Sequence, residues 1–278
     1  DKQMKINKYI GILCLTLLLS TNLAAQQKKL VILHTNDMHS QVEPFSHNDR
    51  YNPGMAGMGN LKAVVDSIRS LYDHVLLLDA GDVVQGTPYY NLFSGRAEIE
   101  SMSQIGYDAA TIGNHEFDKG MDSLKMIYEL ANFPIVCCNY DMSKTPLKHV
   151  VKPYVILKKS GLKIGIMGVG TNPDGLIQKN KYTGMVFLPV VETANKYAEI
   201  LKVKKKCDIV ICLTHIGYRN DLNLAAKSRN IDFFIGGHSH TFMQNADFVL
   251  NADGKTVTVS QCGKGAAFVG MYEILIHK

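Results

Sequence analysis

The side chains best suited to metal chemistry in this chain fall in five short clusters that read, in order, TNDMH, DAGDVVQG, GNHEFD, THIG and GGHSH. Carboxylate, imidazole and amide oxygen together suit borderline or hard divalent ions such as Zn²⁺, Mn²⁺, Fe²⁺ or Co²⁺. The candidate metal ligands are Asp37, His39, Asp82, Asn114, His215, His238 and His240. Their types and their recurrence predict a metal centre.

The number of candidate ligands indicates the size of this centre. Seven such side chains are more than one tetrahedral ion can use. They are enough for two ions that share a carboxylate, and two ions about 3.5–4 Å apart can clamp a phosphoryl oxygen and activate water for in-line attack. Each residue alone also has an ordinary structural interpretation, since Asp37 could cap a helix and Asp82 could form an Asx-turn. The recurrence of the pattern favours the metal centre over these alternatives.

Each cluster follows a predicted strand. The apolar runs at residues 30–34, 75–78, 109–112, 209–213 and 231–235 have the length and composition of buried strands. Strand ends on one edge of an α/β sheet converge in space, and ligand sites form there. Glycines at positions 81, 113, 236 and 237 directly precede candidate ligands and permit the tight turns that such strand ends need.

The rest of the chain completes an α/β pattern. Apolar residues at helical spacing predict helices at 59–72, 98–105, 122–131, 190–204 and 222–228, and further strands are predicted at 135–138 and 163–169. Continuous apolar strands between helices indicate a sheet covered by helices on its faces. The tail differs, because predicted strands at 256–260 and 268–276, joined by a turn at 263–265, indicate a mixed sheet or a second sheet. Residues 43–57 are predicted to form a long loop, and residues 26–278 a single domain.

Composition and charge exclude several classes of protein. With 46% hydrophobic and 20% charged residues, the chain is globular and neither disordered nor fibrous. The net charge of +5 is mild and gives no case for nucleic-acid binding. The lysines at 202, 204, 205 and 206 are predicted to be a solvated helix end, because cations suit helix C-termini.

The first 25 residues have the pattern of a cleaved secretory signal peptide. Lys5 and Lys8 precede an apolar run over residues 9–19, and small residues at Ala24 and Ala25 end the segment. The apolar run is too short for a comfortable membrane span, although uncleaved anchoring is the alternative. We therefore expect an exported protein, periplasmic or extracellular, with no stable membrane span.

The cysteines indicate no metal site of their own. Cys14 lies in the signal peptide, and the spacing of the others matches no zinc ribbon or CxxC motif. The remaining cysteines are Cys137, Cys138, Cys207, Cys212 and Cys262. We expect buried structural thiols. Export would permit a disulfide, but the sequence selects no pair.

The five clusters, in this order, resemble those of the calcineurin-like metallophosphatases. The forms LHTNDMH and GNHEFD resemble the 5′-nucleotidase branch, which includes UDP-sugar hydrolases and 2′,3′-cyclic phosphodiesterases. The similarity spans about residues 30–275. It implies a four-layer α/β/β/α sandwich with mixed sheets and a metal-dependent hydrolase that removes phosphate from small phosphate esters, nucleotides first among them.

The resemblance also implies roles for single residues. Asp37, His39 and His240 would bind the first metal, Asn114, His215 and His238 the second, and Asp82 would bridge both. His115 would stabilise charge on the phosphoryl group or protonate the leaving oxygen, with Asp118 orienting its ring, as general acid catalysis by imidazole requires. Gln85 would line the site. His34 is expected to be structural, and Glu116 is given no role.

Two departures from the branch leave alternatives open. Many nucleotidases of this branch have Gln at the position of His240, where His is the better ligand for transition metals. The sequence ends at Lys278, so the C-terminal domain whose aromatic residues stack on the base in full-length relatives is expected to be absent. The site would then be open and unselective, or a separate partner chain would supply that domain. A thiosulfohydrolase of the same fold and a binding subunit that acts only with a partner are the rival interpretations.

Overall fold

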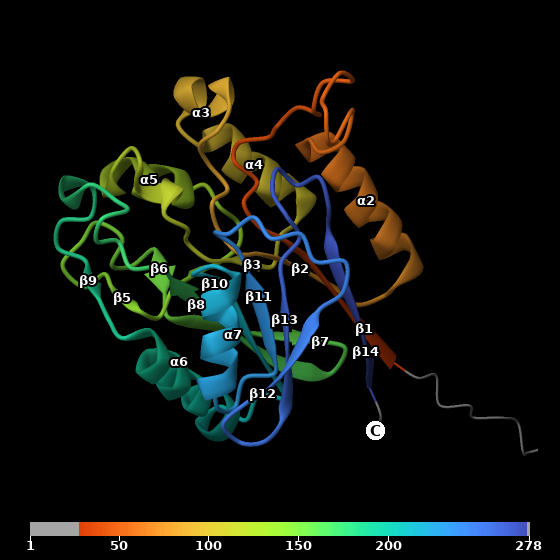
Figure 1. Ribbon diagram of the computed structural model, residues 1–278, viewed down its shortest axis with the longest axis vertical. Helices are drawn as coiled ribbons and strands as arrows, with labels where there is room; N and C mark the ends of the chain where they lie inside the picture. The colour runs from red at the N-terminus through yellow and green to blue at the C-terminus, as the bar shows by residue number, and fades with distance from the viewer. Residues whose placement is uncertain (1–27, 277–278) are drawn as a thin grey trace, which may run out of the picture.

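The computed structural model describes residues 28–276. The signal peptide predicted for residues 1–25, with Cys14, lies outside the described residues. Over residues 28–276 the chain forms two six-stranded sheets and one two-stranded ribbon (Figure 1). The carboxyl ends of most strands point to one end of the molecule, and the longest loops gather there.

The first sheet is parallel except at one edge. In spatial order its strands are β14 (Gly270–Ile276), β1 (Lys28–Thr35), β2 (Val75–Asp79), β3 (Ala109–Ala110), β4 (Ile135–Val136) and β6 (Val151–Lys152). Strand β14 pairs antiparallel with β1, and each other neighbouring pair is parallel.

The second sheet is parallel at its centre and antiparallel at both edges. Its strands, in spatial order, are β12 (Asp247–Leu250), β13 (Thr256–Ser260), β11 (Phe233–Gly236), β10 (Ile209–His215), β8 (Leu162–Gly170) and β7 (Tyr154–Lys159). Strands β12 and β7 are the antiparallel edges. The ribbon pairs β5 (Tyr140–Asp141) with β9 (Val186–Phe187).

Helices cover the outer face of each sheet. The first sheet is covered by α2 (Met58–Leu71), α4 (Arg96–Ile105) and α5 (Met121–Tyr128), and the second by α6 (Val190–Glu199) and α7 (Tyr218–Lys227), while α3 (Pro88–Phe93) projects at the top of the molecule in Figure 1. Short helical turns are η1 (His115–Phe117), η2 (Lys179–Lys181) and η3 (Ile200–Lys204). The last is a π-helical turn that continues α6.

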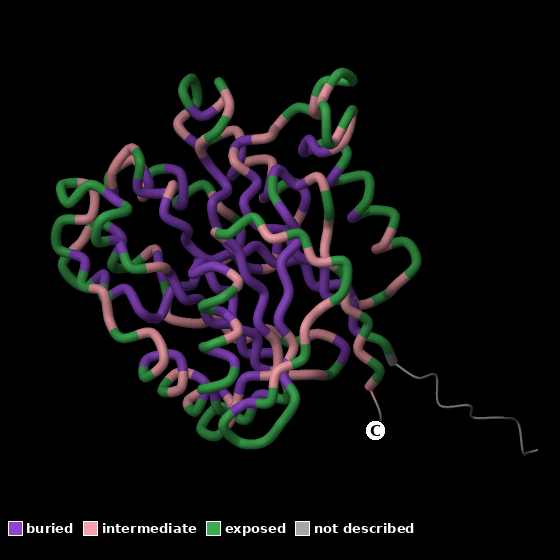
Figure 2. Tube along the Cα trace, viewed as in Figure 1, coloured by how far each residue is buried: buried purple, intermediate pink, exposed green. Residues whose placement is uncertain are grey.

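Three separate apolar clusters show that the molecule has four layers. On β1, Val31 and Leu33 pack toward the helices, whereas Leu30 and Ile32 pack toward the second sheet. This alternation follows from the period of two along a strand. The same alternation on the facing strands fills the space between the sheets, and Figure 2 shows the strands as the buried centre of the molecule. The predicted α/β/β/α sandwich is therefore confirmed.

The C-terminal segment ties the two sheets together. Strand β13 belongs to the second sheet, and β14 belongs to the first. The predicted turn at residues 263–265 is thus part of a connection that crosses from one sheet to the other. The alternation of apolar residues located both strands but could not assign them to different sheets, because pairing depends on residues far away in sequence.

The structure corrects several predicted boundaries. The strand predicted at 109–112 is reduced to two residues, and the helix predicted at 122–131 ends at Tyr128. The helix predicted at 222–228 begins earlier, at Tyr218, after Gly217. Strands β7 and β12 and helix α3 were not predicted. Strand β7 had a usable signal in the turn-forming dipeptide Ser160-Gly161. In the structure these two residues have φ of 56° and 77° and form the tight turn of the β7–β8 hairpin.

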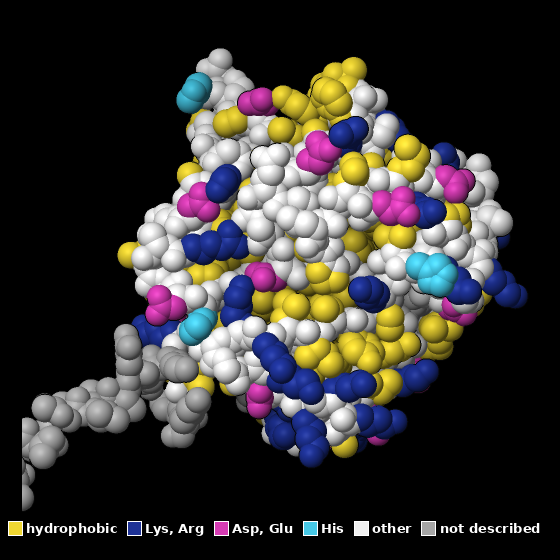
Figure 3. Space-filling model, turned by 180° about the vertical axis from the view of Figure 1, so that it is seen from behind, with side chains coloured by type: hydrophobic (Ala, Val, Ile, Leu, Met, Phe, Trp, Pro, Cys, Tyr) yellow, Lys and Arg dark blue, Asp and Glu magenta, His cyan; other side chains and the backbone are white. Residues whose placement is uncertain are grey.

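The cysteines and surface lysines behave as expected. The five cysteines of the described chain are buried and free of disulfides. Lys204, which ends η3, and Lys205 and Lys206 after it are exposed, whereas Lys202 is half-buried and pairs with Asp232 at 2.9 Å. Lys and Arg side chains gather at the lower end of the face in Figure 3, opposite α3. Within residues 28–276, no helix is both long and apolar enough to cross a bilayer.

The two sheets approach closely at Gly168 on β8. A Cβ atom at this position would overlap the Val136 carbonyl oxygen and Thr111 Oγ1 of the first sheet. Because both neighbours lie in rigid strands or next to them, we expect Gly168→Ala to lower the free energy of unfolding by about 1–3 kcal/mol through overpacking. Urea denaturation monitored by circular dichroism measures this change.

The matched control is Gly59→Ala. Gly59 lies in α2, and an added Cβ would meet nothing within 4 Å. Alanine is the better helix former by roughly 0.5–1 kcal/mol, so this variant should be at least as stable as the parent. Equal stability of the two variants would contradict the close approach of the sheets.

Candidate metal centre

The predicted ligands reach the site from both sheets. Asp37 and His39 follow β1, Asp82 follows β2, and Asn114 follows β3, all in the first sheet. His215 ends β10, and His238 and His240 follow β11, in the second sheet. The structure brings the aspartates and histidines of this set together where the carboxyl ends of the strands meet, and Asn114 follows Gly113, whose backbone lies against Asp82.

The turns that carry these residues are strained. Asp37, His39, Asp82, His238 and His240 all have positive φ, between 49° and 77°. This left-handed backbone costs a residue other than glycine roughly 1–3 kcal/mol, and such strain clusters at functional sites. A local sequence preference would not place five such residues side by side, so the tertiary structure imposes the conformation.

A first group of ligand atoms surrounds Asp37. The Nε2 atoms of His39 and His240 lie 2.9 Å apart, and Asp37 Oδ1 lies 3.4 Å from His240 Nε2. His39 Nδ1 is 3.1 Å from the Gln85 carbonyl oxygen, to which it can only donate. Nε2 of His39 therefore carries a lone pair that is directed at the other donor atoms. At this separation the two Nε2 atoms either share a hydrogen bond, with His240 as the donor, or bind a cation between them.

A second group surrounds Asp82. His215 Nδ1 donates to the Ala80 carbonyl oxygen at 2.7 Å, and its Nε2 lies 3.0 Å from Asp82 Oδ2. Burial opposes a charge on His215, but the Asp82 carboxylate outweighs it and raises the pKa of His215 to about 10. The site thus favours a cation at Nε2, whether a proton or a metal ion.

The donor atoms fit divalent metal ions. In each of the groups Asp37–His39–His240 and Asp82–His215–His238, one donor atom per residue lies within 4.8 Å of the others. Ligands bound at about 2.0–2.2 Å to one ion lie within about 4.4 Å of each other, so small side-chain shifts suffice. The buried Asn114 Oδ1 has no hydrogen-bond partner among the described residues, which is expected of an atom that faces an ion.

The predicted His115–Asp118 pair lies beside these groups. His115 Nδ1 is 2.9 Å from Asp118 Oδ2, and both side chains are about one third exposed. The backbone N–H of His115 donates to Asp82 Oδ1 at 2.9 Å. The ring of His115 contacts that of His39, with centroids 5.4 Å apart. One donor atom each of His115, His39 and Asp82 lie within 4.8 Å of one another, so the imidazole borders the candidate metal site within reach of its donor atoms.

Glu116, for which no role was predicted, holds two of the turns in place. Its buried carboxylate accepts backbone N–H groups from Val83 at 2.8 Å, Gly113 at 2.8 Å and Asp82 at 3.2 Å. It thereby joins the turn of Asp82 to the turn before Asn114. Burial, with Asp82 nearby, raises the pKa of Glu116 to about 8. Its position within GNHEFD was the only available signal, and the partners were not readable from sequence.

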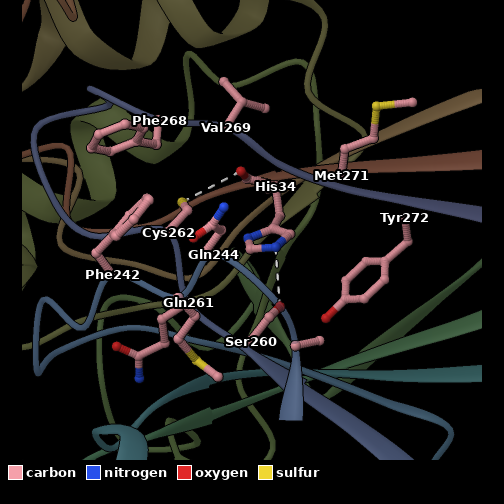
Figure 4. Close-up of a pocket in the computed structure, with 13 residues that line it drawn as sticks. His34, Phe242, Gln244, Ser260, Gln261, Cys262, Phe268, Val269, Met271 and Tyr272 are labelled. Carbon is pink, nitrogen blue, oxygen red and sulfur yellow. Dashed lines mark hydrogen bonds between the residues drawn. The ribbon is translucent and has the colours of Figure 1, made fainter.

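His34 lies outside the site, as expected. It is buried in a separate pocket, where Nε2 lies 3.1 Å from Ser260 Oγ and the ring stacks on Tyr272 (Figure 4). Burial lowers the pKa of His34 to about 4, so the ring is neutral. Two aromatic residues that also line this pocket, Phe242 and Phe268, pack against each other with their ring centroids 4.3 Å apart.

A cavity of about 460 Å³ opens over the His39–His240 pair. His115 and Gln85 also line it, so Gln85 lies at the site as the sequence predicted. The remaining lining residues are Met38, Gln41, Phe45, Gly86, Thr87, Lys264 and Gly265. This cavity is the space available to a ligand that contacts the candidate metal centre.

Comparisons with known proteins agree with this geometry. Residues 30–242 match the calcineurin-like phosphoesterase family. The chain is 32% identical to the trifunctional nucleotide phosphoesterase protein YfkN of Bacillus subtilis, with 88% of this chain and 18% of the relative covered. It is 32% identical to the snake venom 5′-nucleotidase of Gloydius brevicauda, with 91% and 46% covered.

The solved structures give the same result. The 5′-nucleotidase precursor from Thermus thermophilus superimposes with a TM-score of 0.83 at 33% identity, over 90% of this chain and 52% of that chain. The chain thus spans about half the length of the 5′-nucleotidases that it matches.

The role of Glu116 can be tested in protein freed of metal by chelator. In Glu116→Gln the amide NH₂ faces backbone donors, which leaves buried N–H groups unpaired. We expect the free energy of unfolding to fall by about 1–3 kcal/mol, and the affinity for a divalent ion to fall about 10- to 100-fold, as is usual when the partners of metal ligands are lost. Urea denaturation and metal titration measure the two effects.

Glu129→Gln serves as the control, because Glu129 is exposed and its carboxylate pairs, within residues 28–276, only with Lys125. It should change neither quantity appreciably. A Glu116→Gln variant with parental stability and metal affinity would show that the carboxylate does not hold the turns.

Proposed function

The chain belongs to the calcineurin-like phosphoesterase family, and from this we propose that it is a two-metal phosphoesterase that removes phosphate from nucleotides, as 5′-nucleotidases do. The observation that carries the proposal is the convergence of imidazole and carboxylate donor atoms from two sheets, with a histidine–carboxylate pair beside them. The 5′-nucleotidases among its relatives support the choice of nucleotides as substrates.

We propose that the seven predicted ligands hold the ions. Asp37, His39 and His240 would hold one, Asn114, His215 and His238 the other, and Asp82, which lies beside His215, would be shared. Ions held in this way polarise phosphoryl oxygens and lower the pKa of bound water. The identity of the ions among Zn²⁺, Mn²⁺, Fe²⁺ and Co²⁺ is set by supply as much as by the donor atoms.

His115 is proposed to act on the leaving group. Asp118 accepts the Nδ1 hydrogen, which fixes the tautomer and the orientation of the ring. Nε2 can then donate a proton to the ester oxygen as its bond to phosphorus breaks. The partly exposed position at the cavity supports this role, because proton exchange with water restores the acid after each turnover.

Base recognition by this part of the chain is expected to be weak. Phe45 is the only aromatic side chain, apart from histidines, among the described residues that line the cavity. A single ring can stack on a base but cannot sandwich it. We propose that a further domain or a partner chain is needed for tight base binding.

The N-terminal pattern of a signal peptide supports an exported, periplasmic or extracellular, location.

Metal-dependent phosphate release tests the proposed function. The purified chain is stripped with chelator, restored with Mn²⁺, Zn²⁺ or Co²⁺, and given AMP, ribose 5-phosphate, 2′,3′-cyclic AMP and an aryl phosphate. We expect release that requires metal, with two ions bound per chain by elemental analysis and similar KM values for AMP and ribose 5-phosphate. Absence of release with every metal and substrate would reject phosphoesterase activity for this chain alone.

The acid role of His115 predicts a separable effect. His115→Asn should lower kcat about 10²- to 10⁴-fold with metal content unchanged, because His115 is not among the proposed ligands. His149→Asn, at an exposed histidine remote from the cavity, is the control and should retain full activity. Unchanged turnover in His115→Asn would remove this residue from the mechanism.

A further inference from the structure

The charged side chain that lines the cavity over the candidate metal centre is positive, and within residues 28–276 the lining contains no acidic side chain. Among the described lining residues there is one lysine, Lys264, and there is neither Asp nor Glu. The carboxylates of the centre, Asp37 and Asp82, are buried beneath it. A ligand in the cavity therefore meets histidines, amides and one ammonium group, which is an environment that suits an anion.

The segment that carries Lys264 is fixed on both sides by the site itself. The Gly263 carbonyl oxygen accepts Asn36 Nδ2 at 2.7 Å, and the Gly263 N–H donates to the Thr241 carbonyl oxygen at 3.1 Å. The Gly265 N–H donates to the Asp37 carbonyl oxygen at 2.7 Å. The backbone of Lys264 is therefore held between the turn of Asp37 and the turn of His240, and this position does not depend on the lysine side chain.

Glycine is required at 265 for this arrangement. Gly265 has φ of 68°, and a Cβ there would come within 2.7 Å of the Phe45 ring. The loop thus passes tightly between Phe45 and Asp37, and it presents the adjacent Lys264 at the cavity. The close fit indicates a built wall of the cavity and not a loose surface turn.

The ammonium group of Lys264 is available to a ligand. The side chain is exposed, and within residues 28–276 it makes no hydrogen bond or ion pair with another side chain. Some other lysines of the described chain are engaged in ion pairs, as Lys159 is with Asp108 and Lys202 with Asp232. A lysine whose backbone is held in place and whose ammonium group has no partner among the described residues is suited to bind an anion that enters the cavity.

We propose that Lys264 is a specificity-determining residue that binds a phosphate on the leaving group, so that the chain favours substrates in which the scissile phosphoryl group is attached to a second one. This inference rests on the proposed function. With ADP, water attacks the terminal phosphorus, the bond to the bridging oxygen breaks, and AMP leaves with its phosphate beside Lys264. With AMP the leaving group is neutral adenosine, and Lys264 has no anion to bind.

The test compares ADP and AMP as substrates of the metal-restored chain. We expect Lys264→Met to lower kcat/KM for phosphate release from ADP by about 10- to 100-fold, as expected for a hydrogen bond to a charged group, and to change kcat/KM for AMP less than about threefold. Lys264→Arg, which keeps the charge, should retain most of the preference. Equal losses with both substrates, or no loss with ADP, would overturn the proposal.

Lys255→Met is the matched control. Lys255 precedes β13 at the end opposite Lys264, which follows the strand at the cavity, so this variant should keep the activities of the parent.

A second measurement does not need turnover. Isothermal titration of the metal-restored chain should show tighter binding of pyrophosphate than of orthophosphate, and Lys264→Met should abolish the difference.

The two measurements separate the inference from the function on which it rests. If the parent chain hydrolyses neither ADP nor AMP, the proposed activity fails, and the pyrophosphate titration still decides the role of Lys264. Equal affinity for the two anions in the parent would reject Lys264 as a second phosphate site even when AMP is hydrolysed.

Discussion

The contact between Asp82 and His215 is the interaction on which the rest of the site depends. The first residue follows β2 in one sheet, and the second ends β10 in the other, with 3.0 Å between their polar atoms. His215 also bonds the Ala80 carbonyl oxygen across the same gap. The apolar core between the sheets must therefore bring their strand ends into register, because a small slip would separate the donor atoms. A cation at His215 Nε2, whether a proton or a metal ion, binds the Asp82 carboxylate and joins the two sheets.

The arrangement of the candidate ligands requires strained backbone conformations. Five candidate ligands adopt left-handed conformations, and buried Glu116 binds three backbone N–H groups to keep two of the turns together. Strain of this kind persists only where the surrounding structure fixes it. The rigid strands on either side supply that constraint, and the donors are preorganised for an ion, so that little rearrangement is needed on binding.

The segment between β13 and β14, residues 261–269, both connects the two sheets and lines the cavity. It leads into β14, which closes the first sheet as an antiparallel edge strand, and on its way it passes over the strand ends that carry Asp37 and His240. Its backbone bonds to Asn36, Asp37 and Thr241 make it a wall of the cavity. A connection required by topology is thereby placed where a single side chain can affect which leaving groups are accepted.

The sequence by itself determined the layered α/β class, most of the central strands and which side chains gather at the strand ends, because alternation and apolar runs are local and the carboxyl ends of parallel strands meet. It did not determine that β13 and β14 lie in different sheets, nor the roles of Glu116 and Lys264. Those depend on hydrogen bonds between residues distant in sequence, such as Gly265 to Asp37. Residue type limits what a side chain can do, but only the tertiary structure decides which groups it meets.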